Sequence, residues 1–433
     1  MTKEIAVGLL GLGTVGEEIV EIILNHQEDL QYRLDKSIHI KKILIRDLYK
    51  TRSSNVDPSL LTNDYVDVVH HPDIDIIIEV MNGVYPAYDY ISQALETQKQ
   101  VITANTDLVS LHGVELESLA KKNRCDFFYE ASVGGGIPLL SGLSSGFSSD
   151  RIWQIMGVAN GATNYILTNM AKKEISYKTA LEEAKHAKIT GGKPISEVDG
   201  TNSAKKIAIL TRLSFFTDIK LEEIEVTGIT DISTIDLMYA EQLGYKMKLI
   251  GITSCKEGYI EASVQPMFLE ETHPLANIKN SYNGIYVKSE SAGETMFYGR
   301  GAGGLPSATA IVSDVVKAAK NILLGIKGKS TLRQLNEKET MPSDENFSNF
   351  YMRIHVQDVT GSFVIISDLF NQARISFKRI LQNPTSSIGI SEIVIVTHDT
   401  SLANVTRVQA KLNQLGIIDS IDGCFRVEEH TKS

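Results

Sequence analysis

The stretch IAVGLLGLGTVG, residues 5–16, decides the fold of the N-terminal part of the chain. Its first half, residues 5–10, is apolar throughout, which is typical of a parallel strand buried on both faces. Three glycines follow in the pattern G-x-G-x-x-G, between this strand and a segment whose apolar residues repeat at helical spacing. There they permit a tight turn, close approach of the backbone to a diphosphate and close packing of helix on strand. We predict a dinucleotide-binding loop, with an ordinary turn as the alternative; its residues are Gly11, Leu12, Gly13, Thr14, Val15 and Gly16.

Further apolar runs continue the same pattern downstream. Strands are predicted at residues 38–45, 74–80, 100–103 and 127–129, and helices at 17–24, 88–98 and 112–121. Alternation of short buried strands with helices is typical of a doubly wound parallel α/β sheet, the Rossmann fold.

The end of the second strand should select the cofactor. An acidic residue at this point binds the ribose 2′-hydroxyl of NAD, whereas an arginine accommodates the 2′-phosphate of NADP. The chain has both, Arg46 and then Asp47, with Lys50 and Arg52 close behind. The basic residues favour NADP over NAD; the alternative is a solvated charged loop.

Two more domains are expected after residue 130. After the first domain, residues 1–130, residues 131–328 are predicted to form a second α/β domain. Residues 348–430 show the order strand, helix, strand, strand, helix, strand, which indicates a ferredoxin-like domain. A polar linker is expected near 328–347.

Composition excludes several classes of protein. The 433 residues carry a formal net charge of −10, which disfavours a nucleic-acid binder. Three widely spaced cysteines fit a reducing compartment better than a disulfide framework or a zinc site. No window approaches 18 apolar residues, so no membrane partner is expected and the cytoplasm is the expected location.

Several stretches together resemble the homoserine dehydrogenase family, in its long form with a C-terminal ACT domain. They occur in matching order and spacing: GLGTVG (11–16), RDLYK (46–50), TAN (103–105), YEASVGGGIP (129–138), GVANGATNYIL (157–167), EVDG (197–200), AKKIAIL (204–210) and GAGGLPSATAIVSD (301–314). The resemblance implies an NAD(P)-dependent dehydrogenase that interconverts aspartate 4-semialdehyde and homoserine, in threonine and methionine biosynthesis. It further implies that residues 131–328 bind the substrate and form the dimer contact, and that a helix near 305–325 returns to the Rossmann domain. An amino-acid effector at the ACT domain and a homodimer or homotetramer are also implied.

The resemblance further assigns roles to residues. Lys206 would be the catalytic proton donor, and Asn202 takes the place of a second catalytic residue. The cofactor would also contact Asn105, Thr106 and Gly303, and the substrate would contact Gly191, Lys193 and Glu197. A sodium ion would be held at Glu130, Val133, Gly135 and Ile137.

The chain departs from the family pattern in the active site. Thr106 stands where the family has a lysine, Gly191 where it has a glutamate, and Lys193 and Asn202 where it has aspartates. Ile189 replaces an aromatic residue, and Ala162 replaces a hydroxyl-bearing one. Two alternatives therefore stay open: a paralogue acting on a more anionic or non-amino carbonyl substrate, and a non-catalytic protein that binds nucleotides or amino acids.

Overall fold

The computed structural model describes residues 4–49, 56–187, 189, 197–329, 335–385 and 387–429. The chain divides into two compact units. Unit 1 comprises residues 1–152, 205–221 and 288–337, and unit 2 comprises residues 153–204, 222–287 and 338–433. The boundaries expected from the sequence run differently, because the C-terminal block groups with the middle of the chain.

Unit 1 is built on a six-stranded parallel sheet in the order β3-β2-β1-β4-β5-β6. The chain moves outward from β1 to β3 and then crosses back to β4, so the direction of strand order reverses between β1 and β4. In such sheets, ligands bind beyond the carboxyl ends of the strands at this reversal. The strands are β1 (Ile5–Leu10), β2 (Ile38–Leu44), β3 (Leu61–Thr62), β4 (Ile76–Glu79), β5 (Gln100–Thr103) and β6 (Phe127–Phe128).

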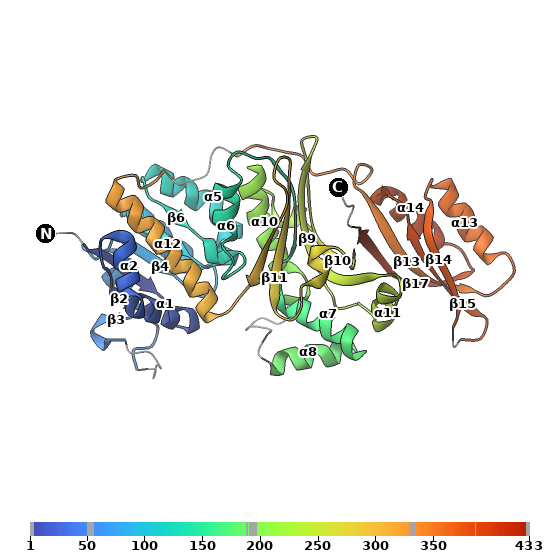
Figure 1. Cartoon of the computed structure of the whole chain (residues 1–433), viewed down its shortest axis with the longest axis horizontal. Coiled ribbons are helices and arrows are strands. Elements are labelled where there is room, and N and C mark those ends of the chain that lie inside the picture. Colours follow the sequence, from blue (N-terminus) through green and yellow to red (C-terminus); the bar gives the residue numbers. More distant parts are fainter. Residues whose placement is uncertain are drawn as a thin grey trace. The chain divides into compact units, whose positions relative to one another are not determined.

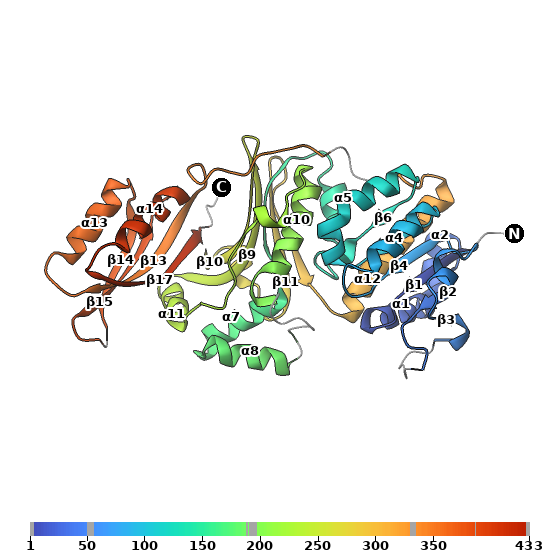
Figure 2. The same ribbon diagram turned by 180° about the vertical axis from the view of Figure 1, so that it is seen from behind.

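Helices cover both faces of this sheet, and its central strands β1, β4 and β5 are buried along their whole length. In Figure 1, α12 (Gly304–Leu324) lies across one face beside α1 (Thr14–Asn25) and α2 (Gln27–Leu34). Figure 2 shows the opposite face with α4 (Ala87–Glu96) and α5 (Thr106–Lys122), and the short α3 (Val66–Val69) also belongs to unit 1. Buried residues of α12 share one core with β1, β4 and α1: Ala308, Ile311, Val315 and Ala319. The helix of residues 304–324 thus completes the hydrophobic core that residues 5–128 begin.

Unit 1 also holds α6 (Leu139–Ser141), β12 (Gly293–Arg300) and most of α10 (Thr201–Phe215). The phosphate loop is shorter than its motif, since α1 already begins at Thr14. Helix α5 begins at Thr106, six residues before the predicted start at 112. Asn105 explains this early start, because its side chain caps the helix by accepting the N–H of Leu108 at 3.1 Å.

In unit 2 the strands of the middle segment and the C-terminal block join one sheet. Its order is β11-β7-β9-β10-β17-β13-β15-β14. The middle segment supplies β7 (Ile152–Val158), β9 (Tyr245–Lys256), β10 (Tyr259–Glu270) and β11 (Tyr282–Ser289), with β8 (Glu225–Val226) beside β10. Its helices are α7 (Gly161–Lys173), α8 (Tyr177–His186) and α11 (Thr234–Gln242).

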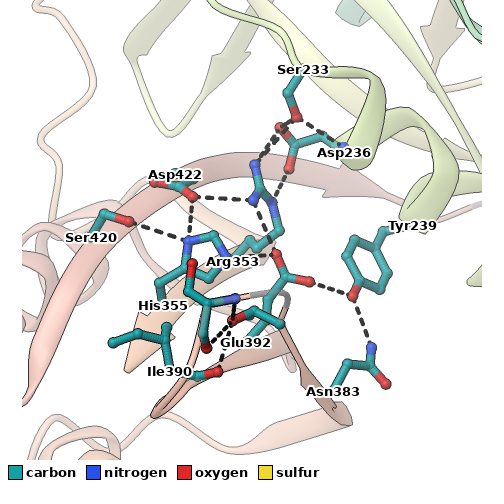
Figure 3. Close-up of polar contacts among 12 residues, drawn as sticks. Ser233, Asp236, Tyr239, Arg353, His355, Asn383, Ile390, Glu392, Ser420 and Asp422 are labelled. Carbon is teal, nitrogen blue, oxygen red and sulfur yellow. Dashed lines mark hydrogen bonds and ion pairs between the residues drawn. The ribbon is translucent and has the colours of Figure 1, made fainter. Parts of the chain in front are cut away.

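The C-terminal block has the predicted order of strands and helices, with one further two-residue strand before the second helix. It comprises β13 (Phe347–Gln357), α13 (Ser362–Gln372), β14 (Phe377–Pro384), β15 (Ile390–Thr397), β16 (Thr400–Ser401), α14 (Leu402–Leu412) and β17 (Ile418–Glu428). Alternate residues of β13 point to opposite faces. Phe350, Met352 and Ile354 pack with α13 and α14, whereas Arg353 and its neighbours face α11 (Figure 3).

Candidate functional site: a dinucleotide pocket and its surroundings

The phosphate loop has the geometry that its glycines predict. Gly11 adopts a φ of +108°, and a side chain there would lie 3.1 Å from the carbonyl oxygen of Val80. A Cβ atom on Gly16 would lie 2.4 Å from the carbonyl oxygen of Gly11, so this glycine allows α1 to pack on the loop. Around Gly13, by contrast, the space within 4 Å of a Cβ atom is open. Gly13 is therefore the glycine that leaves room for a ligand.

A cavity of about 420 Å³ opens at this loop, at the carboxyl ends of β1, β2 and β4. Its lining combines backbone of the loop, apolar side chains and a few polar groups: Gly11, Leu12, Gly13, Leu44, Ile45, Arg46, Asn63, Val80, Met81, Asn82, Pro86 and Tyr90. The helix that starts here presents unpaired N–H groups, because Gly13 offers no side-chain cap. Backbone N–H groups and a helix dipole suit the diphosphate of a dinucleotide.

Of the two charged residues at the end of β2, only Arg46 lines this cavity. The carboxylate of Asp47 accepts the backbone N–H of Tyr49 at 2.9 Å and so stabilises its own turn. A second glycine predicted to contact the cofactor, Gly303, also lies beside the phosphate loop. A Cβ atom on Gly304 would lie 3.0 Å from Cγ2 of Thr14, so the turn at Gly303, with a φ of +132°, lies beside the start of α1.

A buried carboxylate, which the sequence analysis did not single out, organises the neighbouring loop. Glu79, at the end of β4, accepts the hydroxyl of Thr103 at 2.5 Å and the N–H of Met81 at 2.6 Å. Burial raises the pKa of Glu79 to about 7. Asn105 donates to the carbonyl of Gly83 at 2.7 Å, so both ends of the loop 81–83 are held. The available signal was a lone acidic residue that ends the apolar run Ile76-Ile77-Ile78.

One predicted cofactor residue, Thr106, begins α5, and the predicted proton donor Lys206 lies on α10. Thr106 donates its hydroxyl to the carbonyl of Ser132 at 2.7 Å, so this side chain is committed to the protein backbone. Lys206 lies half-buried on α10. The preceding residue, Lys205, forms an ion pair with Asp107, with 2.8 Å between Nζ and Oδ1.

The predicted sodium residues lie in a second polar cluster of unit 1. The carboxylate of Glu130 accepts the N–H groups of Leu140 at 2.7 Å and Ser141 at 2.9 Å. Lys317 places its ammonium 3.5 Å from Glu130 and 2.9 Å from Asp314. Burial raises the pKa of Asp314 to about 6. Val133 and Ile137 are buried nearby, and Gly135 lies with a φ of +54° against the carbonyl of Gly301.

In unit 2 the predicted substrate residues are only partly described. Gly191 and Lys193 lie outside the described residues. Glu197 accepts a hydrogen bond from the side chain of Asn160, which also caps α7 by accepting the N–H groups of Ala162 and Thr163. Asn202 lies in the first turn of α10.

Sequence reasoning missed Lys248 of β9, which is 5% exposed. Its ammonium donates to Asn164 of α7 at 2.7 Å and to the carbonyl of Ile278. Burial, with smaller effects of Lys246 and Lys279, lowers the pKa of Lys248 to about 7. A lysine within a strand gives no sequence signal of such burial.

Within the described ranges, no three His, Cys, Asp or Glu side chains are grouped as a metal ion would require. No helix in the described part of the chain has the length and apolar character needed to cross a membrane.

The comparisons with known proteins agree with this geometry. Residues 11–130 match the family model "Homoserine dehydrogenase, NAD binding domain", and residues 138–316 match "Homoserine dehydrogenase". The chain is 44% identical over 427 residues to the homoserine dehydrogenase of Bacillus subtilis, covering 98% of this chain and 99% of that protein. It is 33% identical to the enzyme of Lactococcus lactis, covering 96% of each.

Solved structures show the same relationship. A homoserine dehydrogenase from Thiobacillus denitrificans superimposes with a TM-score of 0.92 at 30% identity, over 99% of both chains. An archaeal homoserine dehydrogenase in complex with NADPH shares the fold at 23% identity, with a TM-score of 0.63 over 77% of this chain and all of that one. From the family models and the relatives matched over nearly their whole length, this chain belongs to the homoserine dehydrogenase family.

Proposed function

We propose that the chain carries the activity of its family, the NADP(H)-dependent interconversion of aspartate 4-semialdehyde and homoserine. The observation that carries this proposal is the cavity at the phosphate loop, in a chain that matches homoserine dehydrogenases over almost its full length. When bound, the nicotinamide cofactor supplies or accepts the hydride. Lys206 provides the proton that the substrate oxygen takes up during reduction.

The preference for NADP over NAD follows from the groups at the end of β2. Arg46 lines the cavity, where its guanidinium can pair with a ribose phosphate, while Asp47 already accepts the N–H of Tyr49. A charged hydrogen bond of this kind contributes about 1.5–3 kcal/mol, or roughly 10- to 150-fold in affinity. Calorimetric titration with NADPH and NADH tests the preference, and equal affinities would contradict it.

The main test of the proposed activity is NADPH oxidation with aspartate 4-semialdehyde as substrate. Lys206→Ala should lower kcat by about 10²-fold or more, as expected for loss of a positioned general acid. Lys121→Ala, in the exposed last turn of α5, is the matched control and should keep the wild-type rate. Wild-type protein that binds NADPH and leaves aspartate 4-semialdehyde unchanged would refute the activity.

The substituted positions predict a slow enzyme. Thr106 offers no cation to a ligand, and Asn202 cannot accept a proton as an aspartate does. Losing one acid–base partner typically lowers the rate by about 10²–10⁴-fold. Thr106→Lys combined with Asn202→Asp should therefore increase turnover of aspartate 4-semialdehyde, and an unchanged or lower rate would show that these positions do not limit it.

The carboxylate of Glu130 does not fit the role of a sodium ligand. Two backbone N–H groups already donate to it, and the ammonium of Lys317 lies 3.5 Å away, where it would repel a second cation. Oxygen ligands for a hard cation are then left to the carbonyls of Val133, Gly135 and Ile137. Turnover should therefore be equal in sodium chloride and in tetramethylammonium chloride.

For the C-terminal block we propose binding of an amino-acid effector, with threonine as the first compound to test. The support is the strand and helix order of residues 347–428 together with the biosynthetic reaction proposed above. We also propose a homodimer or homotetramer. Inhibition by threonine and the mass measured by light scattering test the two proposals separately.

A further inference from the structure

Helix α10, which carries Lys206, touches α5 at two points on one stripe. Nζ of Lys205 lies 2.8 Å from Oδ1 of Asp107, and Nη2 of Arg212 donates to the carbonyl of Val109 at 3.0 Å. Lys205 and Arg212 are seven residues apart, close to two full turns, so both side chains leave the same face of α10. Two contacts on one face fix the rotation of α10 about its own axis.

The two contacts differ in burial. Arg212 is 2% exposed and lies against Gly113, where a Cβ atom would come within 2.2 Å of the guanidinium. The contact at Arg212 is thus built into the core of unit 1. The side chains of Lys205 and Asp107 are 19% and 25% exposed. Their ion pair is the less buried of the two contacts, and Lys205 directly precedes Lys206 in the sequence.

The position of Asp107 also matters. It is the second residue of α5, and α5 starts three residues after the end of β5, at the carboxyl edge of the sheet where ligands of such folds bind. The preceding residue, Thr106, donates its hydroxyl to the carbonyl of Ser132. The ion pair between Asp107 and Lys205 thus connects the first turn of α5 to α10.

We propose that the Lys205–Asp107 ion pair is a positioning device for Lys206; this rests on the proton-donor role proposed above. Successive residues on a helix are about 100° apart, so the rotation that Lys205 fixes also sets the direction of the Lys206 side chain. A displacement of about 1 Å at a reacting group can lower a rate about 10²-fold. Lys205 and Asp107 are positioning residues, and Lys206 is the group that meets the substrate.

The test uses the full chain, NADPH and aspartate 4-semialdehyde. Lys205→Met and Asp107→Asn should each lower kcat about tenfold and leave KM within about twofold of wild type, because a proton donor is displaced while binding is kept. The charge exchange Lys205→Glu with Asp107→Lys should recover most of kcat, since it restores the pair in reverse. Lys173→Met breaks a comparable exposed ion pair, between Lys173 and Glu183 at 2.6 Å, and should leave kcat unchanged.

Several results would overturn the proposal. If both single variants keep the wild-type kcat, the pair does not position Lys206. If Lys205→Met raises KM and the charge exchange does not recover activity, Lys205 contacts the ligand directly. If kcat falls only in step with the melting temperature, the pair is merely structural. Lys206→Ala separates these failures from failure of the proposed function, because an unimpaired Lys206→Ala variant refutes the proton donor itself.

Discussion

Gly13 and Gly16 lie three residues apart in one motif, yet the structure gives them different tasks. A side chain on Gly13 would meet open space within 4 Å, whereas a Cβ atom on Gly16 would overlap the carbonyl oxygen of Gly11 at 2.4 Å. Backbone atoms cannot rotate out of the way as a flexible side chain can. The absence of a side chain at Gly13 therefore leaves room for a ligand, whereas at Gly16 it allows α1 to pack against the loop.

Two substitutions separate these tasks. Gly13→Val should keep the free energy of unfolding within about 1 kcal/mol of wild type, the cost of a poor helix cap. It should abolish NADPH binding, because the side chain fills the path of the diphosphate. Gly16→Ala should lower the free energy of unfolding by about 1–3 kcal/mol through overpacking. Urea unfolding and calorimetric titration measure both effects, and normal binding by Gly13→Val would show that the diphosphate lies elsewhere.

At the scale of elements, Glu79 joins β4, β5 and the loop that follows β4. Its pKa of about 7 lies above the ordinary value of 4.5, because burial disfavours the charged form. The folded protein therefore binds the proton more tightly than the unfolded chain does. The stability that this provides is complete below pH 4.5 and is lost as the pH rises through 7.

We expect Glu79→Gln to remove this pH dependence. Wild type should lose up to about 3 kcal/mol of unfolding free energy between pH 4.5 and pH 8 through this group, and the variant should lose correspondingly less. Glu96→Gln, on the exposed end of α4, is the control and should follow wild type. Parallel pH profiles of Glu79→Gln and wild type in urea unfolding would contradict the assignment.

The same scale shows what the sequence could predict. A continuous apolar run marked β1, since burial on both faces leaves a signal in every residue of this strand. Two-residue β3 and the polar helix α2 were missed, because neither has enough apolar residues to form a period. Among site residues, Gly11 and Gly13 of the glycine motif and Arg46 at the end of the second strand line one cavity. The roles of Glu79 and Lys248 were not predicted, because they depend on burial by segments distant in sequence.

At the scale of the whole molecule, the sequence did not predict that the C-terminal block would share a sheet with the middle segment. Strand β17 pairs in parallel with β10, with Phe268 opposite Val427. Pairing between residues about 160 positions apart has no local signature, because each strand by itself is compatible with a separate domain. The C-terminal block consequently belongs to the same compact unit as β9 and β10.

A buried ionic cluster reinforces this connection (Figure 3). Arg353 of β13 pairs with Asp236 of α11, with 2.8 Å between Nε and Oδ1, and its Nη1 lies 3.1 Å from Glu392 and 3.2 Å from Asp422. Tyr239 of α11 donates its hydroxyl to Glu392. Arg353 is thus the shared cation of three carboxylates, one of which comes from the middle segment.

Arg353→Met should loosen α11 and the C-terminal strands together. Asp236 is completely buried, and removing one partner of a buried ion pair costs about 3–5 kcal/mol because the other charge is left uncompensated. Since Asp236 lies on α11 and Arg353 on β13, amide hydrogen exchange should accelerate in both elements by a similar factor, while exchange in the sheet of unit 1 stays unchanged. Arg407→Met, which removes an exposed guanidinium from α14, should alter neither. Acceleration in β13 alone would mean that α11 is held by its other contacts and that the two segments do not unfold as one element.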